Sequence, residues 1–155
     1  MHTVLFVCTG NQYRSPIAAE AFRRLLISDG RAQQWNVNSA GTWTSPGNNV
    51  LPHAVELAHL FGLSIEGHKT RMLDAQMLED HSLVLVMEEG HKESIRAEFP
   101  FARAKVYLIS QVLEGLLYDI PDPAKSRTEA KSIIRDLVEM IRAGYGNIYK
   151  IVESV

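Results

Sequence analysis

The first 28 residues contain an apolar run, a short polar loop and a predicted helical segment, one directly after the other. Residues 4–7 are Val-Leu-Phe-Val, Cys8 closes the run, and the loop 9–15 leads to Pro16. Proline suits the first turn of a helix, where its missing N–H costs no hydrogen bond, so we expect a helix over 17–28. A strand that passes through a loop directly into a helix is the building unit of α/β folds.

The same alternation continues along the chain. The run over 83–87, Leu-Val-Leu-Val-Met, has no polar residue and suits a strand buried on both faces of a parallel sheet. We expect strands at 3–8, 35–39, 83–87 and 105–108, and helices at 17–28, 52–61, 74–80, 89–99 and 126–143. The prediction is an α/β fold, a three-layer α/β/α architecture with a four-stranded parallel doubly wound sheet. The chain contains no linker or repeat, so residues 1–155 are expected to form one domain.

The loop after the first predicted strand has the properties of a phosphate-binding loop. Its N–H groups and the positive end of the following helix would bind an anion and favour the thiolate of Cys8. Gly10 and Asn11 tolerate a positive φ, which lets the loop wrap, and Arg14 offers a planar fork of donors to two phosphate oxygens. Ser15 can donate a hydrogen bond to the Cys8 sulfur. An inert buried thiol is the alternative, but Cys8 lies at the end of a strand beside an anion site.

Composition narrows the class of protein. A single cysteine excludes an internal disulfide and fits a reducing compartment. The net charge of −2 is nearly balanced and shows no basic stripe for nucleic acid. No apolar run is long enough for a signal peptide or a membrane span, so we expect a cytoplasmic protein. The six histidines lack metal-ligand spacing, and neither a metal nor a cofactor is expected.

Several segments together resemble the low-molecular-weight protein tyrosine phosphatases. They are 7–11 (Val-Cys-Thr-Gly-Asn), 14–16 (Arg-Ser-Pro), 39–42, 68–71, 83–87 and 119–123 (Asp-Ile-Pro-Asp-Pro). The resemblance covers nearly the whole chain. It implies that Cys8 is the nucleophile, Arg14 the phosphate clamp and Asp122 the general acid. The loop residues Thr9, Gly10, Asn11, Gln12, Tyr13 and Ser15 would bind phosphate, with Ser39 and His68 as supporting members of a network around Asn11.

The implied reaction is hydrolysis of protein phosphotyrosine and small aryl phosphates through a cysteinyl phosphate. A phenolate leaves poorly, because the pKa of phenol is about 10, and Asp122 would protonate it. Taken alone, 119–123 is better interpreted as a polar turn, and a structural role for His68 is as plausible as a functional one. Glu88, Glu89 and His91 are interpreted as residues at a helix start. The expected partners are a phosphorylated protein and a tyrosine kinase, and the oligomeric state stays open.

Three positions depart from the family pattern and leave the substrate open. Tyr13 stands where many members have a second cysteine, Gln12 replaces an aliphatic residue or threonine, and Ala124 follows Asp-Pro where aromatic residues are common. Trp43 would either form a wall of the substrate pocket or cover the edge of the core. A phosphoarginine phosphatase and a non-catalytic phosphate- or phosphopeptide-binding module remain alternatives. A thioredoxin-coupled arsenate reductase would need further cysteines.

Overall fold

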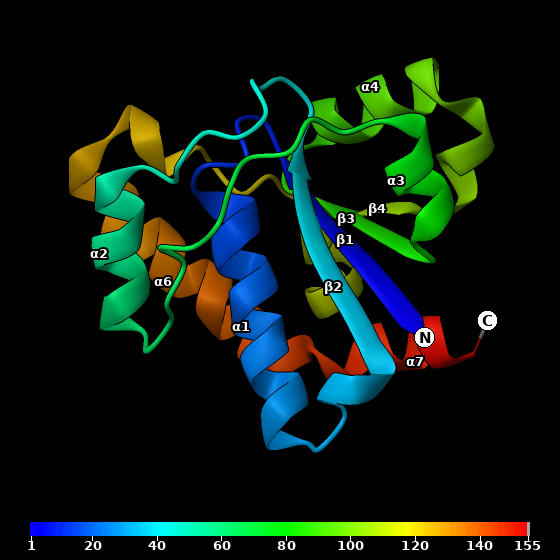
Figure 1. Ribbon diagram of the computed structural model, residues 1–155, viewed down its shortest axis with the longest axis horizontal. Helices are drawn as coiled ribbons and strands as arrows, with labels where there is room; N and C mark the ends of the chain where they lie inside the picture. The colour runs from blue at the N-terminus through cyan, green and yellow to red at the C-terminus, as the bar shows by residue number, and fades with distance from the viewer. Residues whose placement is uncertain (155) are drawn as a thin grey trace.

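A four-stranded parallel sheet forms the centre of the molecule. The computed structural model describes residues 1–154, and its strands are β1 (His2–Cys8), β2 (Trp35–Gly41), β3 (Leu83–Val86) and β4 (Val106–Leu108). All neighbouring strands are parallel, in the order β2-β1-β3-β4 (Figure 1). The three-layer α/β/α fold expected from the sequence is therefore confirmed.

Helices follow each strand, as the alternating pattern predicts. They are α1 (Arg14–Ser28), α2 (Pro52–Leu60), α3 (Ala75–Asp80), α4 (Glu89–Glu98), α5 (Ile109–Glu114), α6 (Arg127–Gly144) and α7 (Gly146–Glu153), with 3-10 turns η1 (Ala32–Gln34), η2 (Pro100–Lys105) and η3 (Pro123–Lys125). Two of them, α5 and α7, were not expected. Both lie outside the expected ranges, which end at residues 108 and 143. No polar break separates α5 from β4 and only Tyr145 separates α7 from α6, so the sequence pattern marks the start of neither helix. None of the helices in residues 1–154 is long and apolar enough to cross a membrane.

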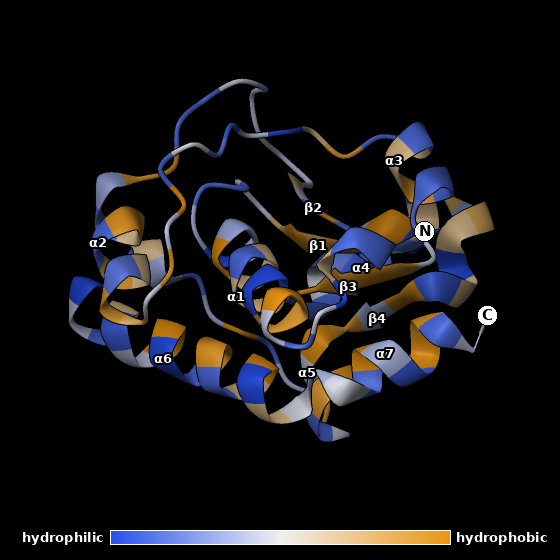
Figure 2. Ribbon diagram, turned by 60° about the horizontal axis from the view of Figure 1, so that its bottom comes forward, coloured by the Kyte–Doolittle hydropathy of each residue, from blue (hydrophilic) through white to orange (hydrophobic). Residues whose placement is uncertain are grey.

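Alternating residues of β1 face two separate hydrophobic layers. Val4, Phe6 and Cys8 belong to the larger cluster, which includes residues of α1, α5, α6 and α7. Leu5 and Val7 belong to the smaller cluster, with residues of α3 and α4. Figure 2 shows the apolar strands between these two helical layers. Because both faces are covered, β1 and β3 are continuous apolar runs rather than alternating ones.

The order of the strands places two loops next to each other. The chain runs from β1 to β2 at one edge, then crosses to β3 on the other side of β1. In a parallel sheet, ligands bind beyond the carboxyl ends of the strands at the position where this order reverses. The segments after Cys8 and after Val86 both begin at that position, so they define where a site can be built.

Candidate active site

Asn11 takes the strained position of the loop between β1 and α1. Its φ is 57°, the one positive φ of a non-glycine residue in the described chain. Gly10 does not have a positive φ, so the expectation that both residues supply left-handed backbone holds for Asn11 alone. Asparagine adopts this conformation more readily than most residues because its short polar side chain can bond locally. At this position the side chain is fully buried.

The Asn11 side chain is held by four hydrogen bonds. Its amide nitrogen donates to Ser15 Oγ (2.8 Å) and to Ser39 Oγ (3.0 Å). Its amide oxygen accepts from Arg71 N (2.9 Å) and lies 3.1 Å from His68 Nε2, which also lies 3.0 Å from the Asn11 carbonyl. An asparagine amide has two donors and two acceptor sites, so this network uses them all. The structure thus brings Ser39 and His68 together with the loop.

Histidine 68 is neutral in this arrangement. Both of its neighbours on Asn11 are acceptors, so Nε2 carries the proton. Burial lowers the pKa of His68, the hydrogen bond to the Asn11 carbonyl raises it, and the nearby charges of Arg23 and Arg71 lower it, with a lowered pKa as the result. A neutral imidazole can therefore hold the loop without placing another charge behind it.

The Cys8 sulfur is positioned by two donors. The Asn11 N–H donates to Sγ over 3.3 Å, and Ser15 Oγ lies 3.0 Å from Sγ. Because Ser15 Oγ already accepts from Asn11, its own proton is directed to the sulfur. Cys8 itself is 2% exposed. Both contacts direct a hydrogen-bond donor at the sulfur, the atom that would act as nucleophile.

Arg14 is the first residue of α1 and is almost completely buried. Its Nη1 donates to Glu88 Oε2 (2.6 Å) and to the Ile120 carbonyl (2.7 Å). Glu88 directly follows Met87 after β3, and Ile120 is tied to Met87 by a backbone hydrogen bond of 2.8 Å. The sequence interpretation placed Glu88 only at a helix start. Glu88 follows directly after β3, which lies beside β1, and this position is the signal that could have predicted its contact with Arg14.

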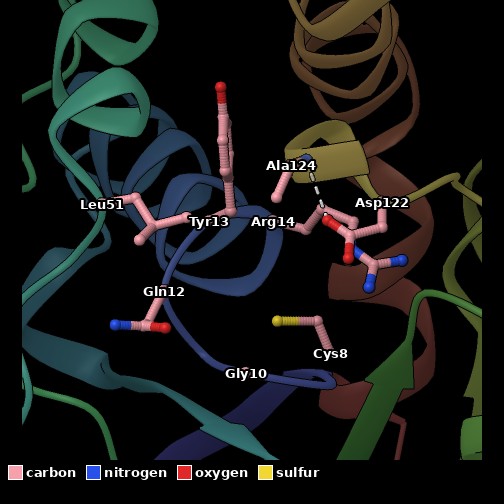
Figure 3. A pocket seen from close by; sticks show the side chains of 8 residues that line it. All are labelled: Cys8, Gly10, Gln12, Tyr13, Arg14, Leu51, Asp122 and Ala124. Carbon is pink, nitrogen blue, oxygen red and sulfur yellow. Dashed lines mark hydrogen bonds between the residues drawn. The ribbon is translucent and has the colours of Figure 1, made fainter. Parts of the chain in front are cut away.

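Asp122 reaches the same cavity from the opposite side. Its Oδ1 accepts a hydrogen bond from Ala124 N (2.9 Å) at the start of η3, where Pro123 is the first residue. Figure 3 shows the Cys8 sulfur and the Asp122 carboxylate in one cavity. The cavity has a volume of about 90 Å³ and is lined by Cys8, Gly10, Gln12, Tyr13, Arg14, Leu51, Asp122 and Ala124.

Loop donors complete the cavity. In the described part of the chain, the N–H groups of Gly10, Gln12 and Tyr13 have no protein acceptor. Together with the N–H groups of the first turn of α1, which have no partner within the helix, they form an arrangement of donors suited to an oxyanion. Residues 1–154 contain no group of three or more His, Cys, Asp or Glu placed to hold a metal ion.

Two aromatic residues behave differently from each other. Tyr13 is 5% exposed, lines the cavity, and its hydroxyl lies 2.9 Å from His53 Nδ1 on α2. Burial raises the pKa of Tyr13 to about 12, so the hydroxyl stays protonated. Trp43 is 80% exposed and lies outside the cavity lining. Trp43 therefore neither walls this cavity nor covers the core edge.

Fold and site together define an α/β protein in which a cysteine, an arginine and a carboxylate line one cavity beyond the end of β1. The sequence pattern of the low molecular weight phosphotyrosine protein phosphatases matches residues 3–153. The chain belongs to this family, and it is a phosphatase.

Individual relatives fall into two groups by name. A candidate low molecular weight protein-tyrosine-phosphatase of Klebsiella pneumoniae is 38% identical over 88% of this chain and 90% of the relative. The protein-arginine-phosphatase of Bacillus subtilis is 31% identical over 90% of this chain and 96% of the relative. Among solved structures, the YwlE arginine phosphatase matches with a TM-score of 0.87 and 32% sequence identity, over 96% of this chain and 95% of that chain. That structure is a cysteine-to-serine variant with a phosphorylated active-site serine. The low molecular weight protein tyrosine phosphatase of T. tengcongensis matches with a TM-score of 0.84 and 30% sequence identity, over 97% of this chain and 99% of that chain.

Proposed function

We propose that the protein hydrolyses phosphotyrosine on proteins, and small aryl phosphates, through a phosphocysteine intermediate. The observation that carries the proposal is the convergence of Cys8, Arg14 and Asp122 on one small cavity at the carboxyl end of β1. A site that only bound phosphate would need the donors of the loop and Arg14. It would need neither a nucleophile nor an acid.

In the first step the Cys8 thiolate attacks phosphorus. The S–P bond forms while the P–O bond to the phenol breaks, and Asp122 gives its proton to the departing oxygen. Arg14 and the loop N–H groups stabilise the charge that spreads over the three remaining oxygens. The phenol leaves neutral, and phosphate stays on the sulfur.

In the second step water replaces the sulfur. Asp122, now ionised, removes a proton from a water molecule whose oxygen attacks phosphorus, and inorganic phosphate is released. The S–P bond breaks and Cys8 leaves as a thiolate, which Ser15 stabilises through the hydrogen bond at 3.0 Å. The first step needs an ionised Cys8 and a protonated Asp122, so activity should peak on the acid side of neutrality.

The walls of the cavity favour a flat apolar leaving group. Figure 3 shows Leu51 and the Tyr13 ring along one side of the opening, above Gln12. This apolar surface stands in for the aromatic residues that the chain lacks after Pro123. A phenyl ring between Tyr13, Leu51 and Ala124 would be held by apolar contact.

One observation favours phosphoarginine as a second candidate substrate. The Gln12 amide nitrogen donates to the Asn49 carbonyl (2.9 Å), which leaves the amide oxygen on the side of Cys8 (Figure 3). An acceptor there could bind a guanidinium N–H of phosphoarginine, whereas a phenyl ester offers no donor. The names of the relatives support both substrates, because they include tyrosine and arginine phosphatases.

The cellular setting is part of the same proposal. One domain spans the chain, acts in the cytoplasm, needs no metal or cofactor, and reverses the action of a tyrosine kinase on a protein. The single cysteine fits a reducing compartment, and the continuous packing of α1, α6 and α7 on one sheet fits a single domain.

The test is hydrolysis of p-nitrophenyl phosphate from pH 4 to 8 without added metal. We expect an acidic optimum, no turnover by Cys8→Ser, and a loss of about 10²-fold or more in Asp122→Ala at the optimum. Cys8→Ser should still bind vanadate or phosphate, because the loop and Arg14 remain. Turnover by Cys8→Ser, or an optimum at pH 8 or above, would contradict the mechanism.

A phosphotyrosine peptide and a phosphoarginine peptide of the same sequence distinguish the two substrates. The Gln12→Leu variant removes the amide acceptor at nearly constant size. If phosphoarginine is the substrate, this variant loses that activity and keeps the activity on phosphotyrosine. If phosphotyrosine is the substrate, native protein prefers the tyrosine peptide and Gln12→Leu changes little.

A further inference from the structure

His91 connects the phosphate loop to the residue that holds Arg14. His91 lies in the first turn of α4 and is 7% exposed. Its Nε2 lies 2.7 Å from Thr9 Oγ1 and 3.8 Å from Glu88 Oε2, the atom that accepts the 2.6 Å hydrogen bond from Arg14. A helix start by itself needs no contact with a loop 82 residues away in sequence.

The hydrogen bonds of His91 fix its tautomer. The Glu88 N–H donates to His91 Nδ1 over 3.1 Å, so Nδ1 must be unprotonated. In a neutral imidazole the other nitrogen then carries the proton, and Nε2 donates to Thr9 Oγ1. Protonation of Nδ1 would set two donors against each other and break the bond to Glu88.

We propose that His91 is a positioning residue for catalysis, which in its neutral form aligns Thr9 of the phosphate loop with Glu88 and, through Glu88, with Arg14. The inference rests on the proposed phosphatase function. The loop supplies N–H donors and Arg14 supplies the guanidinium, and both must surround the same phosphoryl oxygens. The His91 imidazole is hydrogen-bonded to Thr9 and to the backbone N–H of Glu88, so it sets the position of the loop relative to Glu88 and, through Glu88, to Arg14. The geometry of the transition state therefore depends on the protonation state of His91.

The surrounding charges act on His91 in opposite directions. Burial, and then the guanidinium of Arg14, lower its pKa, while Glu88, Asp119 and Asp122 raise it, with a lowered pKa as the result. His91 is thus neutral near pH 7 and becomes protonated on the acid side. On the acid side, the dependence of activity on pH should therefore reflect the protonation of His91 in addition to the ionisations of the reacting groups.

Glutamine is the informative replacement. Its amide oxygen can accept from the Glu88 N–H, as Gln commonly does at this helix position, and its amide nitrogen can donate toward Thr9. His91→Gln therefore keeps both bonds but does not titrate. His91→Ala removes both bonds, and Thr9→Val removes only the bond to the loop.

The experiment measures kcat and KM for p-nitrophenyl phosphate from pH 4.5 to 8 for native protein and the three variants. At pH 7 we expect His91→Ala and Thr9→Val to lose about tenfold in kcat and His91→Gln to stay within about threefold of native. The ratio of native to His91→Gln activity should be constant above pH 6.5 and fall below it. A ratio that stays constant over the whole range, or rescue by glutamine no better than by alanine, would overturn the proposal.

The tautomer provides a measurement that does not depend on activity. Long-range proton–nitrogen NMR spectra at pH 7.5 should show His91 protonated at Nε2 in native protein, and a changed Nε2 environment in Thr9→Val. An Nδ1-protonated ring would overturn the inference even if the phosphatase is active. An inactive native protein that shows the Nε2 tautomer would instead contradict the proposed function, while the contact itself would stand.

Discussion

At the scale of single residues, Asn11 determines the shape of the phosphate loop. Its positive φ turns the backbone, and its side chain fills all four hydrogen-bonding sites within the loop and with the segments around Ser39 and Arg71. A fully bonded buried amide rigidifies its surroundings, whereas a partly bonded one is costly. Preorganisation of the loop therefore comes from one residue and its partners.

Also at the scale of single residues, the presence of Tyr13 in place of a second cysteine affects how reversibly Cys8 is oxidised. Peroxide converts the Cys8 thiolate to a sulfenic acid, and with no second cysteine in the chain the next peroxide gives the irreversible sulfinic acid. We predict that Tyr13→Cys condenses with the sulfenic acid to a disulfide and releases water. Dithiothreitol should then restore most activity to Tyr13→Cys but little to native protein.

The control for this prediction is Tyr13→Ser. It removes the same ring and the same contact with His53 Nδ1 but supplies no thiol. If Tyr13→Ser recovers as well as Tyr13→Cys, or if Tyr13→Cys is lost as irreversibly as native protein, the loop does not bring the two sulfurs together. Mass spectrometry of the oxidised proteins assigns each product.

At the scale of elements, the end of β2 supports the loop after β1 through a close backbone approach. A Cβ on Gly41 would lie 2.5 Å from the Thr9 carbonyl oxygen and 3.2 Å from Asn11 Cβ. Thr42 and Trp43 donate from the backbone to the carbonyls of Cys8 and Thr9 over 2.9 and 3.0 Å. The two strand ends are thus packed too tightly for a side chain.

We predict that Gly41→Ala displaces the phosphate loop. A shift of the loop by several tenths of an ångström should lower kcat/KM by about ten- to a hundredfold and also lower the melting temperature. Gly67→Ala is the matched control, because Gly67 is exposed and its Cβ would meet no atom within 4 Å. Equal activity of Gly41→Ala and Gly67→Ala would contradict the role of this contact.

At the scale of the whole molecule, two buried histidines and one half-buried histidine link stability to pH. Burial is the largest cause that lowers the pKa of His68, His81 and His91 from the ordinary value of 6.5. Below pH 6.5 the unfolded chain therefore binds more protons than the folded one. The free energy of unfolding consequently decreases as the pH decreases. Their contribution is complete above pH 6.5 and is lost as the pH decreases toward the lowered values.

We predict a measurable loss of unfolding free energy between pH 7 and pH 5, observed by urea denaturation. His81 donates from Nδ1 to the Met77 carbonyl (2.6 Å), and its Nε2 lies 3.0 Å from Asn38 Nδ2. His81→Gln should lower stability at pH 7 but flatten its dependence on pH. An unchanged slope in this variant would show that His81 titrates alike in both states.

The sequence by itself determined the fold class and identified the candidate residues for the proposed chemistry. Apolar runs, helix signals and the loop after Cys8 are local patterns in the sequence. Such patterns specify strands and helices through local backbone preferences and burial. All the expected strands and helices were found with shifts of a few residues, and only α5 and α7 were missed. Cys8 lies at one end of a short loop, and Arg14 and Ser15 lie at the other, so their proximity follows directly from the chain.

Only the tertiary structure decided what surrounds that loop. Glu88 and His91 meet Arg14 and Thr9 because β3 lies beside β1, and Trp43 is absent from the cavity lining despite its position after β2. Such contacts depend on strand order and on the direction of side chains, which no short segment encodes. Spacing along the chain specifies which groups a site can contain, while packing across the sheet determines which of them touch.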